Sequence, residues 1–196
     1  FIVKSLPAGG NVTFANTMRA AENGNQFFKV SSANATLPET EKHRMWLNLT
    51  NDAGTAFNQI LVAYAEGATE GVDRGYDGLA FGTTGSALSS KIAGADYTIQ
   101  GRSLPFNAED VVTLGFKAAT AGNYSVTLSA MDGVFLGTQD VYLKDKTAGV
   151  LHDLKAGAYA FASAEGTFDN RFEIVYKNTL GTVDTTLDAN AVVVFR

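Results

Sequence analysis

Residues 70–78, with the sequence EGVDRGYDG, concentrate the residue types that could bind a metal ion. Asp73 and Asp77 offer carboxylate oxygens, and the glycines allow backbone carbonyls to turn inward as further ligands for Ca²⁺. The spacing does not match the loop of an EF-hand. In the alternative that we favour, Arg74 pairs with a carboxylate and Tyr76 packs under the loop. Ca²⁺ at Asp73 and Asp77 is therefore the one cofactor hypothesis, as a stabilising and non-catalytic ion.

Trp46 is the only tryptophan of the chain, and it lies in a segment where apolar and polar residues alternate. A β-strand would place Arg44 and Asn48 on the same face as Trp46. Aromatic rings with polar neighbours form platforms for sugar rings in lectin-like proteins, whereas a lone tryptophan on such a strand more often belongs to the core or covers a sheet face. Arg44, Trp46 and Asn48 are the candidate ligand-binding residues.

Catalytic chemistry has few residues to draw on. The chain has two histidines, His43 and His152, no cysteine, and no GxSxG, HExxH or phosphate-binding glycine motif. A glycosidase needs only two carboxylates across a groove. The candidate pairs lie in loop-like sequence, where carboxylates are typically solvated or cap turns: Glu70/Asp73, Glu109/Asp110 and Glu165/Asp169. We expect a protein that is not an enzyme.

The composition argues against several partners. Of the 196 residues, 45% are hydrophobic and 18% are charged, which suits one substantial core with polar loops. The net charge of -5 includes no run of Lys or Arg, so nucleic acid is not an expected partner. The longest apolar run, residues 191–195, is far shorter than the roughly 20 residues of a membrane span. We therefore expect no membrane insertion, and without cysteine there are no disulfides.

Alternation of apolar and polar residues recurs along the chain, which is the pattern of half-buried β-strands. Tyr124, Val126 and Leu128, for example, fall on one face of such a segment. Asn-Gly and Asp-Gly pairs mark turns at residues 23–24, 77–78 and 132–133. About twelve short strands are expected, in an all-β fold that forms a two-sheet antiparallel β-sandwich resembling a jelly roll. The best helix candidate is residues 16–23.

The domain organisation allows two interpretations. The first is a single β-sandwich module that spans residues 1–196. The alternative is two β lobes, residues 1–103 and 104–196, because Leu104-Pro105-Phe106 follows a stretch rich in Gly, Ser and Ala at residues 82–95.

Several short motifs together produce a family resemblance that covers nearly the whole chain. They are residues 44–50 (RMWLNLT), 57–59 (FNQ), 73–78 (DRGYDG), 99–105 (IQGRSLP), 142–145 (YLKD), 152–155 (HDLK), 159–161 (YAF) and 166–172 (GTFDNRF). With these motifs the chain resembles the C-terminal region of large secreted and surface proteins of flavobacteria. In these adhesin-like proteins such a module precedes the sorting domain of the type IX secretion system, which we expect after Arg196.

The resemblance implies an extracellular location, secreted or attached to the cell surface. It also implies partners among the neighbouring domains of the same polypeptide and the type IX secretion machinery, and it supplies no catalytic residues. The expected function is a non-catalytic structural or adhesive module of a secreted surface protein. The alternative is a carbohydrate-binding module with surface glycans as partners, and a glycoside hydrolase-like enzyme ranks third.

Asp184-Thr185-Thr186 is similar to the short acceptor used for O-glycosylation of exported proteins in this bacterial group. We predict a glycan on Thr185. The intact mass of the protein from its native host would then exceed the mass calculated from the sequence.

Overall fold

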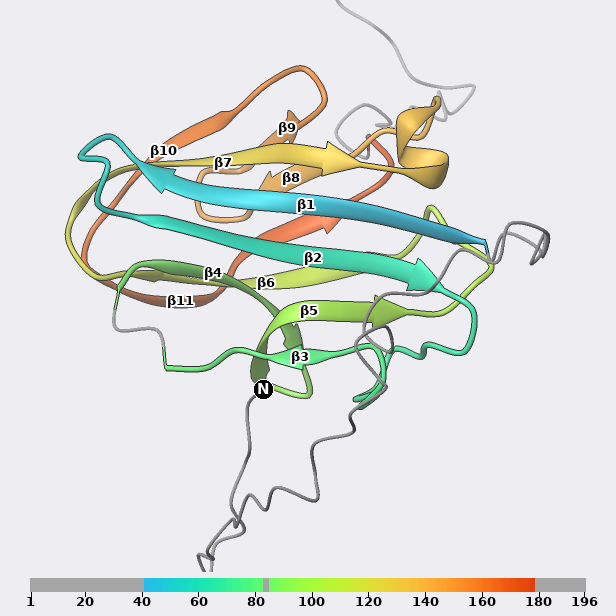
Figure 1. The fold of residues 1–196 in the computed structure, drawn as a ribbon. Coiled ribbons are helices and arrows are strands. Elements are labelled where there is room, and N and C mark those ends of the chain that lie inside the picture. Colours follow the sequence, from blue (N-terminus) through green and yellow to red (C-terminus); the bar gives the residue numbers. More distant parts are fainter. Residues whose placement is uncertain (1–40, 83–84, 179–196) are drawn as a thin grey trace, which may run out of the picture. The chain divides into compact units, whose positions relative to one another are not determined.

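The computed structural model describes residues 41–82 and 85–178. Strands dominate this part, and its one helical element is a 3-10 turn, η2 (Gly133–Leu136), which confirms the all-β prediction (Figure 1). The predicted helix at residues 16–23 and the acceptor Thr185 lie outside the described residues. The strands are β1 (Lys42–Asn51), β2 (Phe57–Ala65), β3 (Gly78–Leu79), β4 (Ala87–Ile92), β5 (Ala95–Arg102), β6 (Val111–Ala118), β7 (Gly122–Met131), β8 (Tyr142–Asp145), β9 (Val150–Asp153), β10 (Tyr159–Ser163) and β11 (Gly166–Val175).

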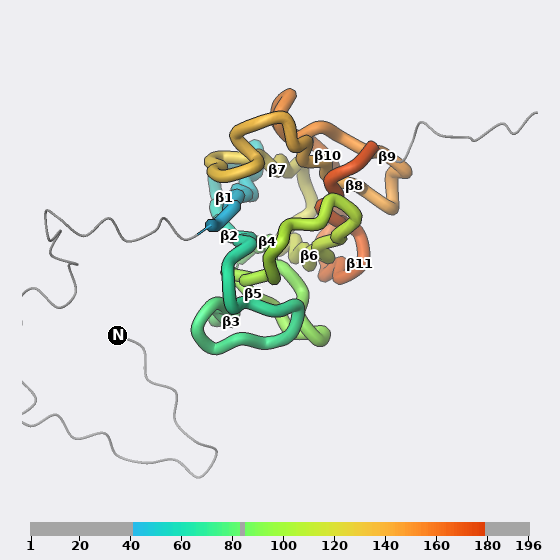
Figure 2. The backbone as a smooth tube through the Cα atoms, turned by 90° about the vertical axis from the view of Figure 1, so that its right-hand side faces the viewer, coloured from blue at the N-terminus to red at the C-terminus, as the bar shows by residue number. Residues whose placement is uncertain are grey.

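The strands join in one continuous sheet, whereas the sequence predicted the two sheets of a sandwich. The order along the sheet is β10-β7-β1-β2-β5-β4-β6-β11-β8-β9, and β3 pairs with β5. β2 and β5 are parallel, and the other described pairs are antiparallel. The sheet folds back on itself, so that β1 and β2 lie on one side and β6 and β11 on the other (Figure 2).

Strands from the two halves of the chain are interleaved in this sheet. β1 pairs with β7, and β4 pairs with β6, so the hydrogen-bonded ladders connect segments on both sides of residues 103–107. Alternation in the sequence determines which residues of a strand are buried, but it does not determine which strands pair.

One hydrophobic core fills the inside of the folded sheet. On β1, Met45, Leu47 and Leu49 are completely buried, while the residues between them are partly exposed. Aromatic rings fill much of the remaining space. The ring of Phe116 contacts Tyr124, Phe161 and Phe172 in edge-on arrangements, with centroids 5.2 to 5.8 Å apart. Burial of this apolar surface is the main stabilising contribution to the fold.

Side chains connect the edge strand β10 to β8 and β11. Asp145, at the end of β8, is completely buried and accepts hydrogen bonds from Arg171 Nη2 at 2.8 Å and from the Tyr159 hydroxyl of β10 at 3.1 Å. The Arg171 guanidinium carbon also lies 4.6 Å from the ring centroid of Phe161 and 4.8 Å from that of Phe172. Motifs of the C-terminal half therefore meet in one cluster that connects β10, at one edge of the sheet, to β8 and β11.

Candidate functional site

β1 places Arg44, Trp46 and Asn48 together on the sheet face opposite to the core. Trp46 pairs with Leu61 of β2, and Leu61 pairs with Ile99 of β5, which is 40% exposed. Paired residues share a face, with Cβ atoms roughly 5 Å apart. An apolar row therefore crosses three strands on the outside of the sheet. Gln59 lies beside this row, since it pairs with Asn48. We term the surface that these side chains form the Trp46 face, and its residues are Arg44, Trp46, Asn48, Gln59, Leu61 and Ile99.

Arg44 is fixed by Asp132 and lies over the tryptophan. Its Nε and Nη2 donate to Asp132 Oδ2 at 2.7 and 2.5 Å, and its backbone N–H donates to Oδ1 at 2.8 Å. The guanidinium carbon lies 5.0 Å from the centroid of the Trp46 ring, within the range of a cation–π contact. Because these contacts restrict both side chains, a partner would meet a preorganised surface.

A polar line runs beside the apolar row. The side-chain amide of Gln59 donates to Asn48 Oδ1 at 2.8 Å and to the hydroxyl of Ser129, on β7, at 3.2 Å. The Ser129 hydroxyl donates to the Trp46 carbonyl at 3.2 Å. The Trp46 face lies outside both pockets described below, and it suits contact with an extended partner.

Asp73 and Asp77 organise their own loop. Asp73 Oδ2 accepts hydrogen bonds from the backbone N–H of Thr69 at 2.6 Å and from its hydroxyl at 2.8 Å. Asp77 Oδ2 accepts from the backbone N–H of Asp73 at 2.5 Å, and Oδ1 accepts from that of Gly101 at 2.7 Å. Within the described residues, no group of three or more His, Cys, Asp or Glu side chains gathers as a metal site. The Ca²⁺ hypothesis stays a prediction.

The alternative interpretation of this loop has two parts, the pairing of Arg74 and the packing of Tyr76, and the structure bears on them differently. Among the ion pairs of the described residues none joins Arg74 to Asp73 or Asp77, whose carboxylates accept from backbone N–H groups instead, and the pairing of Arg74 with a carboxylate stays a prediction. Tyr76 does pack against the loop, since its hydroxyl donates to the Glu66 carbonyl at 2.7 Å. A Cβ on Gly101 would lie 2.5 Å from Tyr76 Cβ, so the glycine makes room for this ring.

The other residues considered for catalysis contact structural partners. His43 is buried, and its Nδ1 accepts from the backbone N–H of Val134 at 3.3 Å. His152 Nε2 donates to the Gly157 carbonyl at 3.1 Å. Four of the six acidic residues of the candidate pairs contact separate groups: Glu70 with Ser103, Glu109 with Lys177, Asp110 with Arg102, and Asp169 with Lys91.

Several carboxyl groups have pKa values that are shifted downward, whereas a general acid needs an upward shift. The hydrogen bond from the Ser103 hydroxyl lowers the pKa of Glu70. Burial alone would raise the pKa of Asp145 and of Glu173, but Arg171 outweighs it for Asp145 and Lys146 for Glu173, so both pKa values are lowered. A glycosidase acid requires a raised pKa. These groups stay ionised at neutral pH and do not supply protons.

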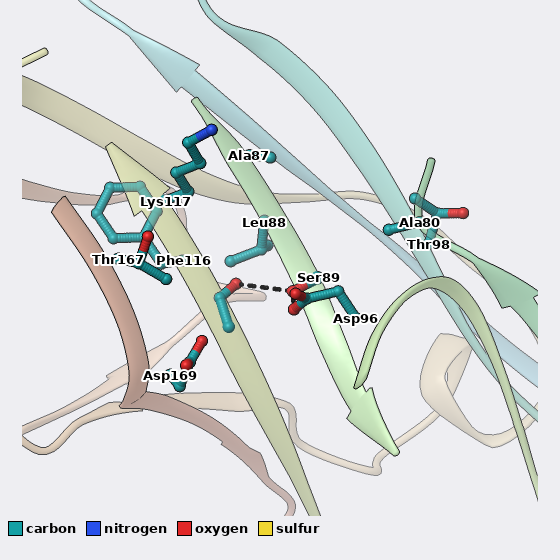
Figure 3. Close-up of a pocket in the computed structure, with 11 residues that line it drawn as sticks. Ala80, Ala87, Leu88, Ser89, Asp96, Thr98, Phe116, Lys117, Thr167 and Asp169 are labelled. Atoms are coloured by element: carbon teal, nitrogen blue, oxygen red, sulfur yellow. Dashed lines mark hydrogen bonds between the residues drawn. The ribbon is translucent and has the colours of Figure 1, made fainter. Parts of the chain in front are cut away.

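A pocket of about 200 Å³, which we term the polar pocket, opens between β4, β5, β6 and β11 (Figure 3). At its side, Lys91 Nζ lies 2.7 Å from Asp96 Oδ1 and 2.7 Å from Asp169 Oδ1. The Ser89 hydroxyl donates to Asp96 Oδ1 at 2.5 Å. The sequence did not reveal this pocket. The lining residues are Ala80, Ala87, Leu88, Ser89, Asp96, Thr98, Gly115, Phe116, Lys117, Thr167 and Asp169.

Electrostatic contacts keep the groups beside this pocket charged. Burial alone would lower the pKa of Lys91, but hydrogen bonds and charges of Asp169 and Asp96 outweigh it and raise the pKa. Burial alone would raise the pKa of Asp96, but Lys91 and the Ser89 hydroxyl lower it. Asp169 reaches Lys91 from the β-bulge of β11, where the register shifts between Phe168 and Phe172.

A second, more open groove of about 510 Å³ lies beside residues 103–110, and Tyr64, Phe106 and Asp110 are among its lining residues. Asp110 Oδ2 accepts from the Tyr64 hydroxyl at 2.7 Å and from Arg102 Nε at 2.5 Å. The Tyr64 and Tyr176 hydroxyls are 2.9 Å apart. Burial is the main cause that raises the pKa of both phenols. Because the Arg102 guanidinium pairs with the Asp110 carboxylate and both phenols stay protonated, this network stabilises the fold.

The structure defines an all-β domain built on one folded sheet, with the Trp46 face on the outside of β1, β2 and β5 and the polar pocket between β4, β5, β6 and β11. Residues 1–176 match the model of the family described as Domain of unknown function (DUF8693), and the chain belongs to this family. No curated protein and no solved structure matches the chain. In the part of the chain that the structure describes, no helix has the length and apolar character needed to cross a membrane.

Proposed function

We propose that the chain is a non-catalytic adhesive module of a secreted surface protein, and that the Trp46 face is its contact surface. The observation that carries this proposal is the outward apolar row of Trp46, Leu61 and Ile99 beside fixed polar groups. Tryptophan and arginine are enriched where protein surfaces bind partners, and the energy concentrates on such anchors. The resemblance to flavobacterial adhesin-like proteins supports an extracellular location.

The electrostatics support a non-catalytic role. Four of the six acidic side chains that could have formed a glycosidase pair contact Ser103, Lys177, Arg102 and Lys91, and the pKa of Glu70 is lowered. Neighbouring domains of the same polypeptide and the type IX secretion machinery are the further partners that we propose.

Adhesion of beads coated with the purified chain tests the proposal. Beads are counted on immobilised surface polysaccharide and surface protein prepared from the producing cells. Trp46→Ala removes the anchor of the Trp46 face, and loss of such a residue costs about 2 kcal/mol, or roughly 30-fold in affinity. Leu136→Ala is the matched control, because Leu136 is 68% exposed on η2. Equal adhesion of the wild type and Trp46→Ala would contradict the proposal.

A carbohydrate-binding module is the second candidate. The Trp46 ring lies beside the side-chain amides of Asn48 and Gln59, which is the combination of an aromatic platform and hydrogen-bonding groups that sugars require. A glycan array would show hits for the wild type that disappear in both Trp46→Ala and Asn48→Ala. Hits that survive both substitutions would exclude the Trp46 face as the sugar site.

A further inference from the structure

Small residues on β4 and β6 leave space for the polar pocket, and the longer side chains of Lys91 and Lys117 lie around them. Ala87 pairs with Lys117, and Ser89 pairs with Gly115, on adjacent strands. A Cβ on Gly115 would lie 2.5 Å from Lys91 Cε and 2.7 Å from Ser89 Oγ. The glycine therefore lets Lys91 cross β6 and reach Asp169 on the far side.

Lys91 holds two carboxylates in fixed positions. Its side chain is 11% exposed, whereas those of Asp96 and Asp169 are 51% and 56% exposed. Both carboxylates use Oδ1 to contact the ammonium group. Within residues 41–82 and 85–178, no side chain or backbone group donates a hydrogen bond to Oδ2 of either carboxylate. Two preorganised acceptors therefore face the solvent at the pocket.

Charges of both signs lie at the pocket. Lys91 contacts both Asp96 and Asp169, and Lys117 is a further basic residue of the lining, so the pocket suits neither a strong anion nor a strong cation. The remaining polar groups are hydroxyls, which both donate and accept hydrogen bonds: Ser89, Thr98 and Thr167. This set of groups matches a neutral ligand that itself carries several hydroxyls.

The size of the pocket limits the ligand further. Its volume of about 200 Å³ corresponds to roughly seven water molecules at liquid density, which suits one sugar ring and excludes a buried disaccharide.

We propose that the polar pocket binds a single neutral sugar residue. Asp96 and Asp169 accept hydrogen bonds from the sugar hydroxyls, and the Thr167 hydroxyl completes the set. The site shares no residue with the Trp46 face. The proposal is therefore independent of the proposed contact surface and concerns a different ligand-binding position.

The test is a titration of the full chain with the methyl glycosides of glucose, galactose and mannose, followed by backbone-amide NMR. We expect at least one of them to shift the amides of Ser89, Gly115 and Thr167, with a Kd on the order of 1 mM. Asp169→Asn should weaken this binding about tenfold, because hydrogen bonds to a charged acceptor are the strong ones. Glu165→Gln, an exposed carboxyl group in the turn before β11, is the matched control and should bind as the wild type does.

Ala80→Leu provides a second variant that keeps both carboxylates, and its larger side chain at the pocket should abolish binding. The proposal is overturned if no glycoside shifts these amides up to about 50 mM. It is also overturned if Asp169→Asn binds as tightly as Glu165→Gln, or if sulfate or spermidine binds the pocket more tightly than the glycosides do. Trp46→Ala should leave the amide shifts unchanged. Loss of the amide shifts in Trp46→Ala would assign the sugar to the Trp46 face. If Trp46→Ala loses only bead adhesion and keeps the amide shifts, the polar pocket remains the sugar site.

Discussion

Replacing Asp145 by Asn should remove a large part of the stability of the domain. The Asn side chain keeps an oxygen acceptor for the backbone N–H groups of Thr147 and Ala148, which lie 2.9 and 3.1 Å from Oδ1. The substitution therefore removes the charge, and it places an amide N–H donor where Oδ2 accepts from Arg171 and Tyr159. Arg171, whose side chain is only 10% exposed, loses its ionised partner and becomes an uncompensated buried charge.

Removal of one partner of a buried ion pair costs about 3–5 kcal/mol. Arg171 keeps its cation–π contacts with Phe161 and Phe172, so we expect a loss of about 3 kcal/mol in the free energy of unfolding. For a domain of this size, such a loss lowers the Tm by roughly 6–12 °C. Since domains are stable by about 5–15 kcal/mol, the variant should remain folded at room temperature.

Urea unfolding followed by circular dichroism measures this loss. Glu109→Gln is the control, because Glu109 and Lys177 form an exposed ion pair with side chains 67% and 51% exposed, and it should change the free energy by less than about 0.5 kcal/mol. The double variant Asp145→Leu with Arg171→Met should be more stable than Asp145→Asn, because apolar residues leave no unpaired charge. A loss below about 1 kcal/mol for Asp145→Asn would refute the reasoning.

Three further predictions concern the pH dependence of stability, the polar pocket, and the loop that contains Asp73 and Asp77. Because folding lowers the pKa of Asp145, its ionised form stabilises the protein above the usual carboxyl pKa of about 4, and this contribution disappears as the pH falls through the folded-state pKa; acid titration should therefore destabilise the wild type more than Asp145→Asn. Gly115→Ala should displace Lys91 and lower the Tm by a few degrees, in contrast to the exposed change Gly85→Ala, where a Cβ meets nothing. Asp77→Ala should lower the Tm even in the presence of chelator, because the hydrogen bonds from the N–H groups of Asp73 and Gly101 are lost. A rise in the wild-type Tm with Ca²⁺ that Asp77→Ala abolishes would establish the ion, and equal wild-type Tm values in Ca²⁺ and in chelator would exclude it.

Local sequence patterns predicted the all-β class and the buried faces of individual strands. The alternation predicted one shared face for Tyr124, Val126 and Leu128; Tyr124 and Val126 are buried in the core, and Leu128 packs against it. The pairing of strands was not predictable, because period-two patterns carry no information about the partner strand. The parallel contact between β2 and β5, which joins the two sides into one sheet, is such a long-range feature.

The candidate sites show the same limit. The shared face of Arg44, Trp46 and Asn48 followed from their spacing, but the row from Trp46 to Ile99 depends on the register between strands. The polar pocket depends on a β-bulge that brings Asp169 to Lys91, and no local pattern reports a bulge of this kind.

Fluorescence of Trp46 tests the central claim most directly, because the only tryptophan of the chain lies on the proposed contact surface. The chain is titrated with the soluble surface polysaccharide or surface protein to which coated beads adhere, and emission and acrylamide quenching are recorded in the free and bound states. If the Trp46 face is the contact surface, the partner buries the partly exposed ring, so the emission shifts to shorter wavelength and quenching decreases. Saturating binding with unchanged emission and unchanged quenching would contradict the account.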